Sequence, residues 1–221
     1  MSSPLSSPAI GHRVGDGADR SSLEALWLET LGTICERVAH EIKGALNGVV
    51  VNVEVVRSRS AKADVSGASL HQYAQSASSQ LDVVIAMTEA MLALTRPPRR
   101  PLSIAQTVRH VDALVGAAAR ADDKRIELQG MVDAVGTTSA SPDVARLVIG
   151  AAFIAAVDSS TDLVCSATPG TDGAALCWEV RGGGRESESI PAIDPAVLAL
   201  AASEGIEVQK NGQQLSITFP R

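Results

Sequence analysis

Apolar side chains recur every three or four positions along the first part of the chain, and this spacing predicts two long helices. The first is expected from "SSLEALWLETL", where Ser21 or Ser22 can cap it, to about Ser60. The second is expected over residues 69–95. The polar break "SRSAKADVSGAS" lies between them, and the proline-rich "RPPRRP" follows the second. The pattern therefore predicts a long helical hairpin.

The pattern changes after the proline-rich linker, where short apolar runs alternate with helical segments. Helices are expected at "SIAQTVRHVDALVGAAARADD", at "SPDVARLVIGAAFIAAVDSS" with Ser141 as cap and Pro142 in the first position, and at "DPAVLALAASEG". Strands are expected at "RIELQG", "LVCSAT" and "ALCWEVRG", and "IEVQKNGQQLSITFPR" is typical of a hairpin with Asn-Gly at its tip. This order predicts a sandwich of three helices on a mixed sheet.

The whole chain is thus expected to be α+β, with an N-terminal helical hairpin and a C-terminal α/β sandwich. Residues 1–20, rich in Ser, Pro and Gly, are predicted to be a disordered tail. We expect the hairpin to extend over 21–97 and the sandwich domain over 98–221.

Composition narrows the classes of function. Of the 221 residues, 45% are hydrophobic and only 2% aromatic, so the core must consist of Ala, Val, Leu and Ile. The net charge of −6 argues against nucleic-acid binding, which needs a basic surface. No apolar run approaches the ~20 residues of a membrane span, and the first residues lack the apolar core of a signal peptide. The three cysteines show neither CxxC nor metal spacing. We therefore expect a cytoplasmic protein without a membrane or nucleic-acid partner.

The stretch "ERVAHEIKGALNGVV", residues 36–50, carries a histidine inside the first predicted helix. At about 100° per residue, one third of the helix circumference holds an apolar stripe of Ile34, Val38, Ile42, Ala45, Leu46, Val49, Val53 and Val56. His40 lies on the opposite side with Arg37, Gly44, Asn47 and Val51. A histidine packed in the core would lie within the stripe. Two interpretations remain, a solvated histidine without a role and a reactive group offered to a partner.

The neighbours of His40 favour the reactive interpretation. An imidazole with a pKa near ~6.5 is largely neutral and nucleophilic at one nitrogen at cytosolic pH. The carboxylate of Glu41 is a plausible general base beside it. Gly44 removes bulk one turn further on, and Val51 supplies an exposed apolar contact. Two further residues, Arg37 and Lys43, are either ligands for a phosphate or an acidic partner, or ordinary solvated charges.

The segment "ERVAHEIKGALNGVVVNVEVV" resembles the H-box of sensor histidine kinases, usually His-Glu-Ile/Leu-Lys/Arg-Asn-Pro-Leu. The residues that match are His40, Glu41, Ile42, Lys43 and Leu46, whereas Gly44 and Ala45 depart. The resemblance implies that His40 is the phosphoacceptor, that Glu41 handles the proton, and that two hairpins pair into a dimeric four-helix bundle. Because Gly44 stands where the family has the Asn or Thr that orients water, phosphatase activity is not expected.

The C-terminal half resembles the ATP-binding domain of the same kinases in outline. The resemblance places the helix that should hold Mg²⁺ and phosphates at "RLVIGAAFIAAVDSS", but Gly150 and Ile154 occupy the places of its asparagines, and a hydrophobe cannot ligate a hard cation. "EVRGGGRESES" keeps glycines 182–184 of an adenine loop without its aspartate. The resemblance therefore implies a lost nucleotide site, with neither ATP nor a resident metal bound.

A chain that keeps the phosphoaccepting histidine and lacks the nucleotide site resembles the dimeric histidine phosphotransferases. These proteins are built on a degenerate kinase fold and include the ChpT and sporulation phosphorelay types. The resemblance implies a homodimer that relays a phosphoryl group between response-regulator receiver domains, with Mg²⁺ supplied by the receiver. The alternatives are a non-catalytic pseudokinase regulator that binds a receiver or a kinase, a divergent active histidine kinase, and a plain structural helical dimer.

Overall fold

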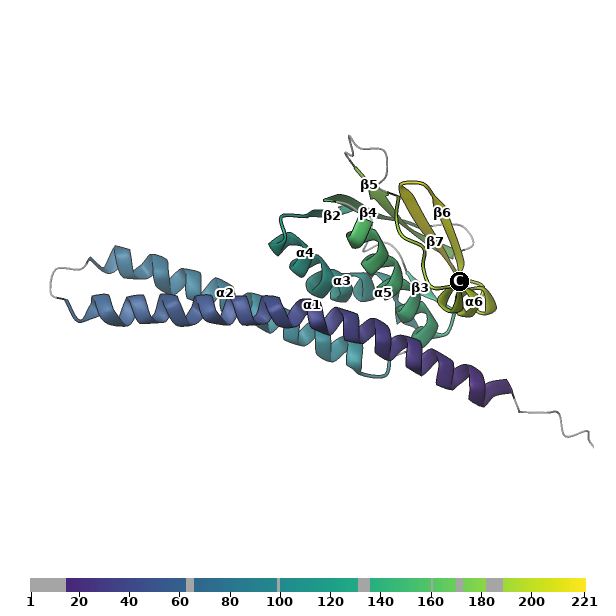
Figure 1. Ribbon diagram of the computed structural model, residues 1–221, viewed down its shortest axis with the longest axis horizontal. Coiled ribbons are helices and arrows are strands. Elements are labelled where there is room, and N and C mark those ends of the chain that lie inside the picture. Colours follow the sequence, from purple (N-terminus) through teal and green to yellow (C-terminus); the bar gives the residue numbers. More distant parts are fainter. Residues whose placement is uncertain are drawn as a thin grey trace, which may run out of the picture.

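The computed structural model describes residues 15–62, 66–98, 100–130, 136–159, 161–169, 173–181 and 189–221. Helix α1 (Gly15–Ser60) and helix α2 (Gly67–Thr95) run side by side as the predicted hairpin. The rest of the chain forms an α/β unit on one flank of the hairpin, and the hairpin tip projects away from it (Figure 1). The fold is therefore α+β, with a long N-terminal helical region and a C-terminal mixed sheet.

Helix α1 begins six residues earlier than the sequence pattern predicted. It starts at Gly15, so the predicted tail over 1–20 is wrong for its last residues, and Ser21 and Ser22 lie inside the helix. Residues 1–14 lie outside the described part of the chain.

A close contact between the two helices occurs at Gly48. A Cβ atom at this position would overlap the end of the Gln80 side chain on α2, which would have to shift. Asn52, one turn further along α1, donates through Nδ2 to Ser76 Oγ and Gln80 Oε1, both at 3.2 Å. Toward the base of the hairpin, Met87 and other apolar α2 residues are buried. The pairing thus combines a polar layer with an apolar base.

The C-terminal unit has the element order that the sequence predicted, with two additions. Its helical elements are α3 (Ile104–Val111), the π-helix η1 (Asp112–Gly116), α4 (Ala117–Ala121), α5 (Pro142–Ser159) and α6 (Pro195–Ser203). Its strands are β1 (Leu102–Ser103), β2 (Arg125–Gly130), β3 (Thr137–Thr138), β4 (Asp162–Pro169), β5 (Gly173–Val180), β6 (Glu207–Asn211) and β7 (Gln214–Pro220). Asp194 caps α6 by accepting from the Ala196 amide, and Gly205 and Gly212 adopt positive φ at the predicted turns.

The sheet is mixed, with strand order β2-β4-β5-β7-β6. β2 and β4 are parallel, and the remaining neighbours are antiparallel. The strands alternate between buried and partly exposed residues, with Leu176, Trp178 and Ile217 among those facing the helices. In Figure 1, α3 and α5 lie between this sheet and the hairpin. The core is therefore a layer of helices covered by a sheet on one side and by α1 and α2 on the other.

The two additions are features that apolar periodicity does not encode. One is the short antiparallel pair of β1 and β3. The other is the π-helical turn, which interrupts the helix predicted over 103–123. In this turn a Cβ at Gly116 would overlap Asp112 Oδ1, and Asp112 accepts from Arg120 Nη2 at 2.7 Å. The turn therefore makes room for a half-buried ion pair between Asp112 and Arg120.

Arg146 on α5 joins the two halves of the chain. Its side chain is only 8% exposed. Nη1 donates to the carbonyl oxygens of Leu94 and Arg96 at the end of α2, at 2.7 and 2.9 Å, and the guanidinium carbon lies 4.1 Å from the centroid of the Trp27 ring on α1. Both helices of the hairpin are thereby fixed to α5.

The outer face of the hairpin carries exposed apolar side chains. They include Leu46, Val50 and Val53 on α1, which are 43%, 66% and 53% exposed, and Leu81, Ile85 and Leu92 on α2. Two of the eight residues of the predicted apolar stripe on α1, Leu46 and Val53, are thus exposed. Contrary to the expectation from sequence, α2 has the length and apolar composition to cross a membrane, with 22% of its most apolar window buried. Exposed apolar side chains in such numbers are typical of a surface that packs against another apolar surface.

Candidate functional site

His40 lies on α1 where this helix passes the C-terminal unit. The His40 side chain is exposed, while Arg37 and Glu41 beside it are half-buried. These three residues line one wall of a cavity of about 360 Å³. The opposite wall comes from the α4 region and from the end of α5, and comprises Ala118, Ala119, Asp122, Lys124, Val157 and Asp158. The predicted phosphoacceptor is thus at the edge of a charged cavity shared by both halves of the chain.

Arg37 forms a bidentate ion pair with Asp158 across this cavity. Nη1 lies 2.8 Å from Oδ1 and Nη2 lies 2.8 Å from Oδ2. The hydrogen bonds to Asp158 raise the pKa of Arg37 against the opposing effect of burial, and the charges of Asp158 and Asp122 add to the increase. Arg37 lies one turn from His40 along the helix and lines the same cavity, and it is already engaged.

The second cation in the cavity is Lys124, which is also engaged. Its Nζ donates to the carbonyl oxygen of Val157 at 2.7 Å, in the last turn of α5. Helix C-termini attract cations because their last carbonyl groups lack partners within the helix. Lys124 therefore completes the end of α5 while keeping its charge at the cavity wall.

The remaining predicted site residues lie on the open surface of α1 and do not line the cavity. Lys43, Gly44, Asn47 and Val51 are all exposed, with Val51 at 60%. Apart from the backbone of α1 and the neighbours of Gly44 in the chain, no atom of the described residues lies within 4 Å of a Cβ placed on Gly44, so there is open space one turn from His40. The structure therefore separates the predicted set into a cavity group of Arg37, His40 and Glu41 and a surface group along the same helix. Their roles stay predictions.

Sequence reasoning missed the cavity residues of the C-terminal unit, namely Asp122, Lys124 and Asp158. Arg37 and Asp158 are 121 positions apart. The segments around them, "ARADDKR" and "AAVDSSTD", contain no motif that points to His40. Only the packing of α1 across α4 and α5 brings them together, so no local signal in the sequence could have identified them.

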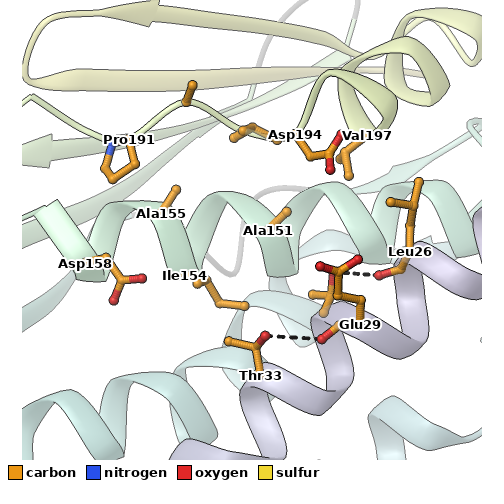
Figure 2. A pocket seen from close by; sticks show the side chains of 13 residues that line it. Leu26, Glu29, Thr33, Ala151, Ile154, Ala155, Asp158, Pro191, Asp194 and Val197 are labelled. Carbon is orange, nitrogen blue, oxygen red and sulfur yellow. Dashed lines mark hydrogen bonds between the residues drawn. The ribbon is translucent and has the colours of Figure 1, made fainter.

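The region where the resemblance places a nucleotide site is covered by α1. A Cβ on Gly150 would lie 3.2 Å from Thr30 Cγ2 and 3.8 Å from Trp27 Cζ3, so α1 packs directly on this position. Ile154, one turn further along, lines a cavity of about 250 Å³ between α1, α5 and the 191–194 segment. Figure 2 shows Ile154 pointing toward the α1 side chains there. Glycines 182–184, the predicted remnant of the adenine loop, lie outside the described residues.

The described residues offer no ready metal centre. Within them, no group of three or more His, Cys, Asp or Glu side chains could hold a metal ion. The three cysteines are free, and burial raises the pKa of Cys165 to about 12, which keeps this thiol protonated and inert. The chemistry available around His40 is therefore that of an imidazole, carboxylates, a guanidinium and an ammonium group.

Comparisons with known proteins identify no family for the chain. No protein-family model matches it, and no curated protein matches it. Among the solved structures, the histidine kinase AdeS of Acinetobacter baumannii is weakly similar, with a TM-score of 0.35 and 14% sequence identity over 82% of this chain and 97% of that chain. This likeness to a histidine kinase is too low to assign an activity.

Proposed function

We propose that the chain is a histidine phosphotransferase of a two-component phosphorelay, which passes a phosphoryl group between receiver-domain aspartates through His40. The observation that carries this proposal is the position of His40. It is exposed on the first helix of a hairpin, with Glu41 next to it and a guanidinium one turn away. The match of "HEIK" to the H-box motif supports the same role.

The reaction needs one nucleophilic nitrogen and one proton acceptor. An imidazole nitrogen of His40 attacks the phosphorus of a phospho-aspartate, a P–N bond forms as the P–O bond breaks, and the carboxylate leaves with the electron pair. The second ring nitrogen then gives its proton to Glu41 or to water, which leaves a neutral ring carrying the phosphoryl group. Transfer to a second aspartate is the reverse of this step, so the protein mainly positions the group.

The proposal includes the absence of kinase activity toward ATP. Gly150 offers no oxygen ligand and is covered by Trp27 and Thr30, and the hydrocarbon side chain of Ile154 cannot ligate Mg²⁺. A side chain at position 150 would press on Thr30 of α1. Mg²⁺ would come with the receiver domain and the phosphoryl group from its aspartate.

The active form is proposed to be a homodimer built on a four-helix bundle. Exposed apolar residues recur at three- and four-residue steps, as Leu46, Val50 and Val53 on α1 and as Leu81 and Ile85 on α2. This spacing is typical of helices that pair along a seam. Charged side chains such as Asp82 lie beside the seam on α2, which favours a second copy in water over a lipid surface. We place the protein in the cytoplasm, without a nucleic-acid or membrane partner.

The receiver domain is proposed to dock on the open face of α1 around His40. Gly44 leaves space beside the imidazole, and the 60% exposed Val51 offers an apolar contact two turns further on. Lys43 and Asn47 add a cation and an amide on the exposed surface of the same turns. The acidic phosphoacceptor pocket of a receiver suits such a surface.

The test is transfer from phosphorylated receiver domains of the same cell to the purified chain. We expect an acid-labile, base-stable label that disappears in His40→Gln while the variant keeps its helical content. Receiver binding without any label, unchanged in His40→Gln, would instead identify a non-catalytic regulator. Calorimetric binding of Mg·ATP at micromolar affinity, with label transferred from ATP, would identify a divergent active kinase. No label and no binding would leave only a structural dimer.

A further inference from the structure

The cavity next to His40 holds more acidic than basic groups. Two basic residues, Arg37 and Lys124, and three acidic residues, Glu41, Asp122 and Asp158, line it. Three of these five charges come from the C-terminal unit. A phosphoryl group on His40 adds two further negative charges at the edge of this cavity.

Both cations are committed to other partners before any phosphoryl group arrives. Arg37 donates to both carboxylate oxygens of Asp158, a geometry that uses the side of the guanidinium best suited to a phosphate. Lys124 donates to the Val157 carbonyl oxygen. Residues three apart on a helix are neighbours, so Arg37 is within reach of a group on His40, but both of its terminal nitrogens already donate to Asp158, and binding to a phosphoryl group competes with this pair.

We infer that Asp158 and Asp122 are positioning residues that keep the phosphoryl group on His40 weakly held, so that it passes on readily to the next acceptor. Asp158 acts by retaining Arg37, and Asp122 acts by repulsion through space. The inference rests on the proposed function of His40. It assigns to the C-terminal unit a role in the energetics of transfer, in place of nucleotide binding.

The measurement is the equilibrium occupancy of His40 with a small donor, which needs no receiver domain. Phosphoramidate gives its phosphoryl group to imidazole, a P–N bond replacing a P–N bond, and ammonia leaves with the electron pair. With phosphoramidate and ammonium at fixed concentrations, the phosphorylated fraction of the full chain is read on a phosphate-affinity gel. Label on other histidines is subtracted with His40→Gln.

Asp158→Asn frees Arg37 and removes one negative charge, so we expect the ratio of phosphorylated to free His40 to rise by about threefold or more. Asp122→Asn should raise it less, and Arg37→Met should lower it. Asp158→Asn and Arg37→Met break the same ion pair but move the ratio in opposite directions, which a merely structural role does not predict. All shifts should shrink in 1 M salt.

Asp123→Asn is the matched control, because it removes the same charge one residue from Asp122 but outside the cavity. Asp123 has φ 60°, a conformation that asparagine also tolerates. If Asp158→Asn and Asp122→Asn behave like Asp123→Asn, or if Arg37→Met moves the ratio in the same direction as Asp158→Asn, the inference is wrong. Failure of receivers to label His40 would instead refute the proposed function, so the two outcomes are separate.

Discussion

Replacing Arg146 by methionine tests how the hairpin is held on the C-terminal unit. Arg146 donates to the carbonyl oxygens of Leu94 and Arg96, to Asp143 Oδ1 at 3.0 Å, and lies over the Trp27 ring. Methionine has a similar length and keeps the apolar contact with Trp27. The substitution removes the donor to the Leu94 and Arg96 carbonyl oxygens at the end of α2. Because the hydrogen bond to Leu94 is buried, this carbonyl group would be left without a partner in the interior.

The expected loss follows from opposing contributions. A hydrogen bond to a charged group contributes about 1.5–3 kcal/mol, and a cation over an aromatic ring up to about 2 kcal/mol when desolvated. Burial opposes them: it lowers the pKa of Arg146, which shows that removing the cation from water is unfavourable. Nε of Arg146 has no protein partner within the described residues. We therefore expect a net loss of about 2–4 kcal/mol in the free energy of unfolding.

Urea unfolding followed by circular dichroism measures this loss, and a thermal scan should show a decrease in Tm of roughly 5–15 °C. Arg57→Met is the control, because the Arg57 side chain is 77% exposed and pairs with Glu54 on the surface. The control should stay within about 0.5 kcal/mol of the parent. If Arg146→Met is as stable as Arg57→Met, the assignment of Arg146 as the joint between hairpin and C-terminal unit is refuted.

Three further predictions address the seam, the covered helix face and a buried carboxyl. Val50→Glu should convert the proposed dimer to a monomer in analytical ultracentrifugation, whereas Val51→Glu, on the adjacent His40 face, should stay dimeric and lose the proposed transfer from the receiver. Gly150→Asn should reduce the free energy of unfolding by about 1–3 kcal/mol by pressing on α1, without gaining Mg·ATP binding in calorimetry. Burial raises the pKa of Asp112 against the effect of Arg120, so protonation favours the folded state and that contribution is lost as pH rises through the folded pKa. The stability of Asp112→Asn relative to the parent should therefore increase from pH 4 to pH 7 in urea titrations.

Each of these has an outcome that contradicts it. If Val50→Glu and Val51→Glu have the same oligomeric state, the proposed dimer contact does not include Val50 of α1. If the parent protein floats with lipid vesicles, the apolar face binds a membrane instead. Gly44→Asn, at a position with open space around it, is the control for Gly150→Asn and should leave stability unchanged. A pH-independent difference for Asp112→Asn would mean that this carboxyl is not buried in solution.

The sequence pattern was sufficient for the order of the helices and strands because each of them has a local signal. Apolar spacing identified α1, α2 and α5, and Asp194, Gly205 and Gly212 marked the ends of elements with their characteristic chemistry. The π-turn at Asp112–Gly116 was not predictable, because apolar spacing does not distinguish a π-helical turn from the α-helix around it. The first residues of α1 were assigned to a disordered tail, because residues 1–20 are rich in Ser, Pro and Gly and show no apolar periodicity.

The candidate site was predictable only on the helix that carries it. The wheel placed His40 on the side of α1 away from the apolar stripe, and the structure confirms that it is exposed. The helical wheel does not distinguish apolar residues that pack inside this chain from apolar residues that stay exposed. Ile34 and Leu46 both belong to the predicted stripe, but Ile34 is buried and Leu46 is exposed. Asp158 could not be found, because no periodicity links positions 121 apart.

The unequal lengths of the hairpin helices have a mechanical consequence. At about 1.5 Å per residue, the 46 residues of α1 extend over roughly 70 Å and the 29 of α2 over roughly 45 Å. The additional turns at the start of α1 include Trp27, which contacts α5, while Val50 lies farther along the same rod. A rotation of α1 about its axis would therefore move the C-terminal unit, His40 and the exposed apolar side chains of α1 together. A C-terminal unit fixed to such a rod has little freedom to move along the hairpin, and the proposed transfer does not need this motion, because its partners would dock at His40.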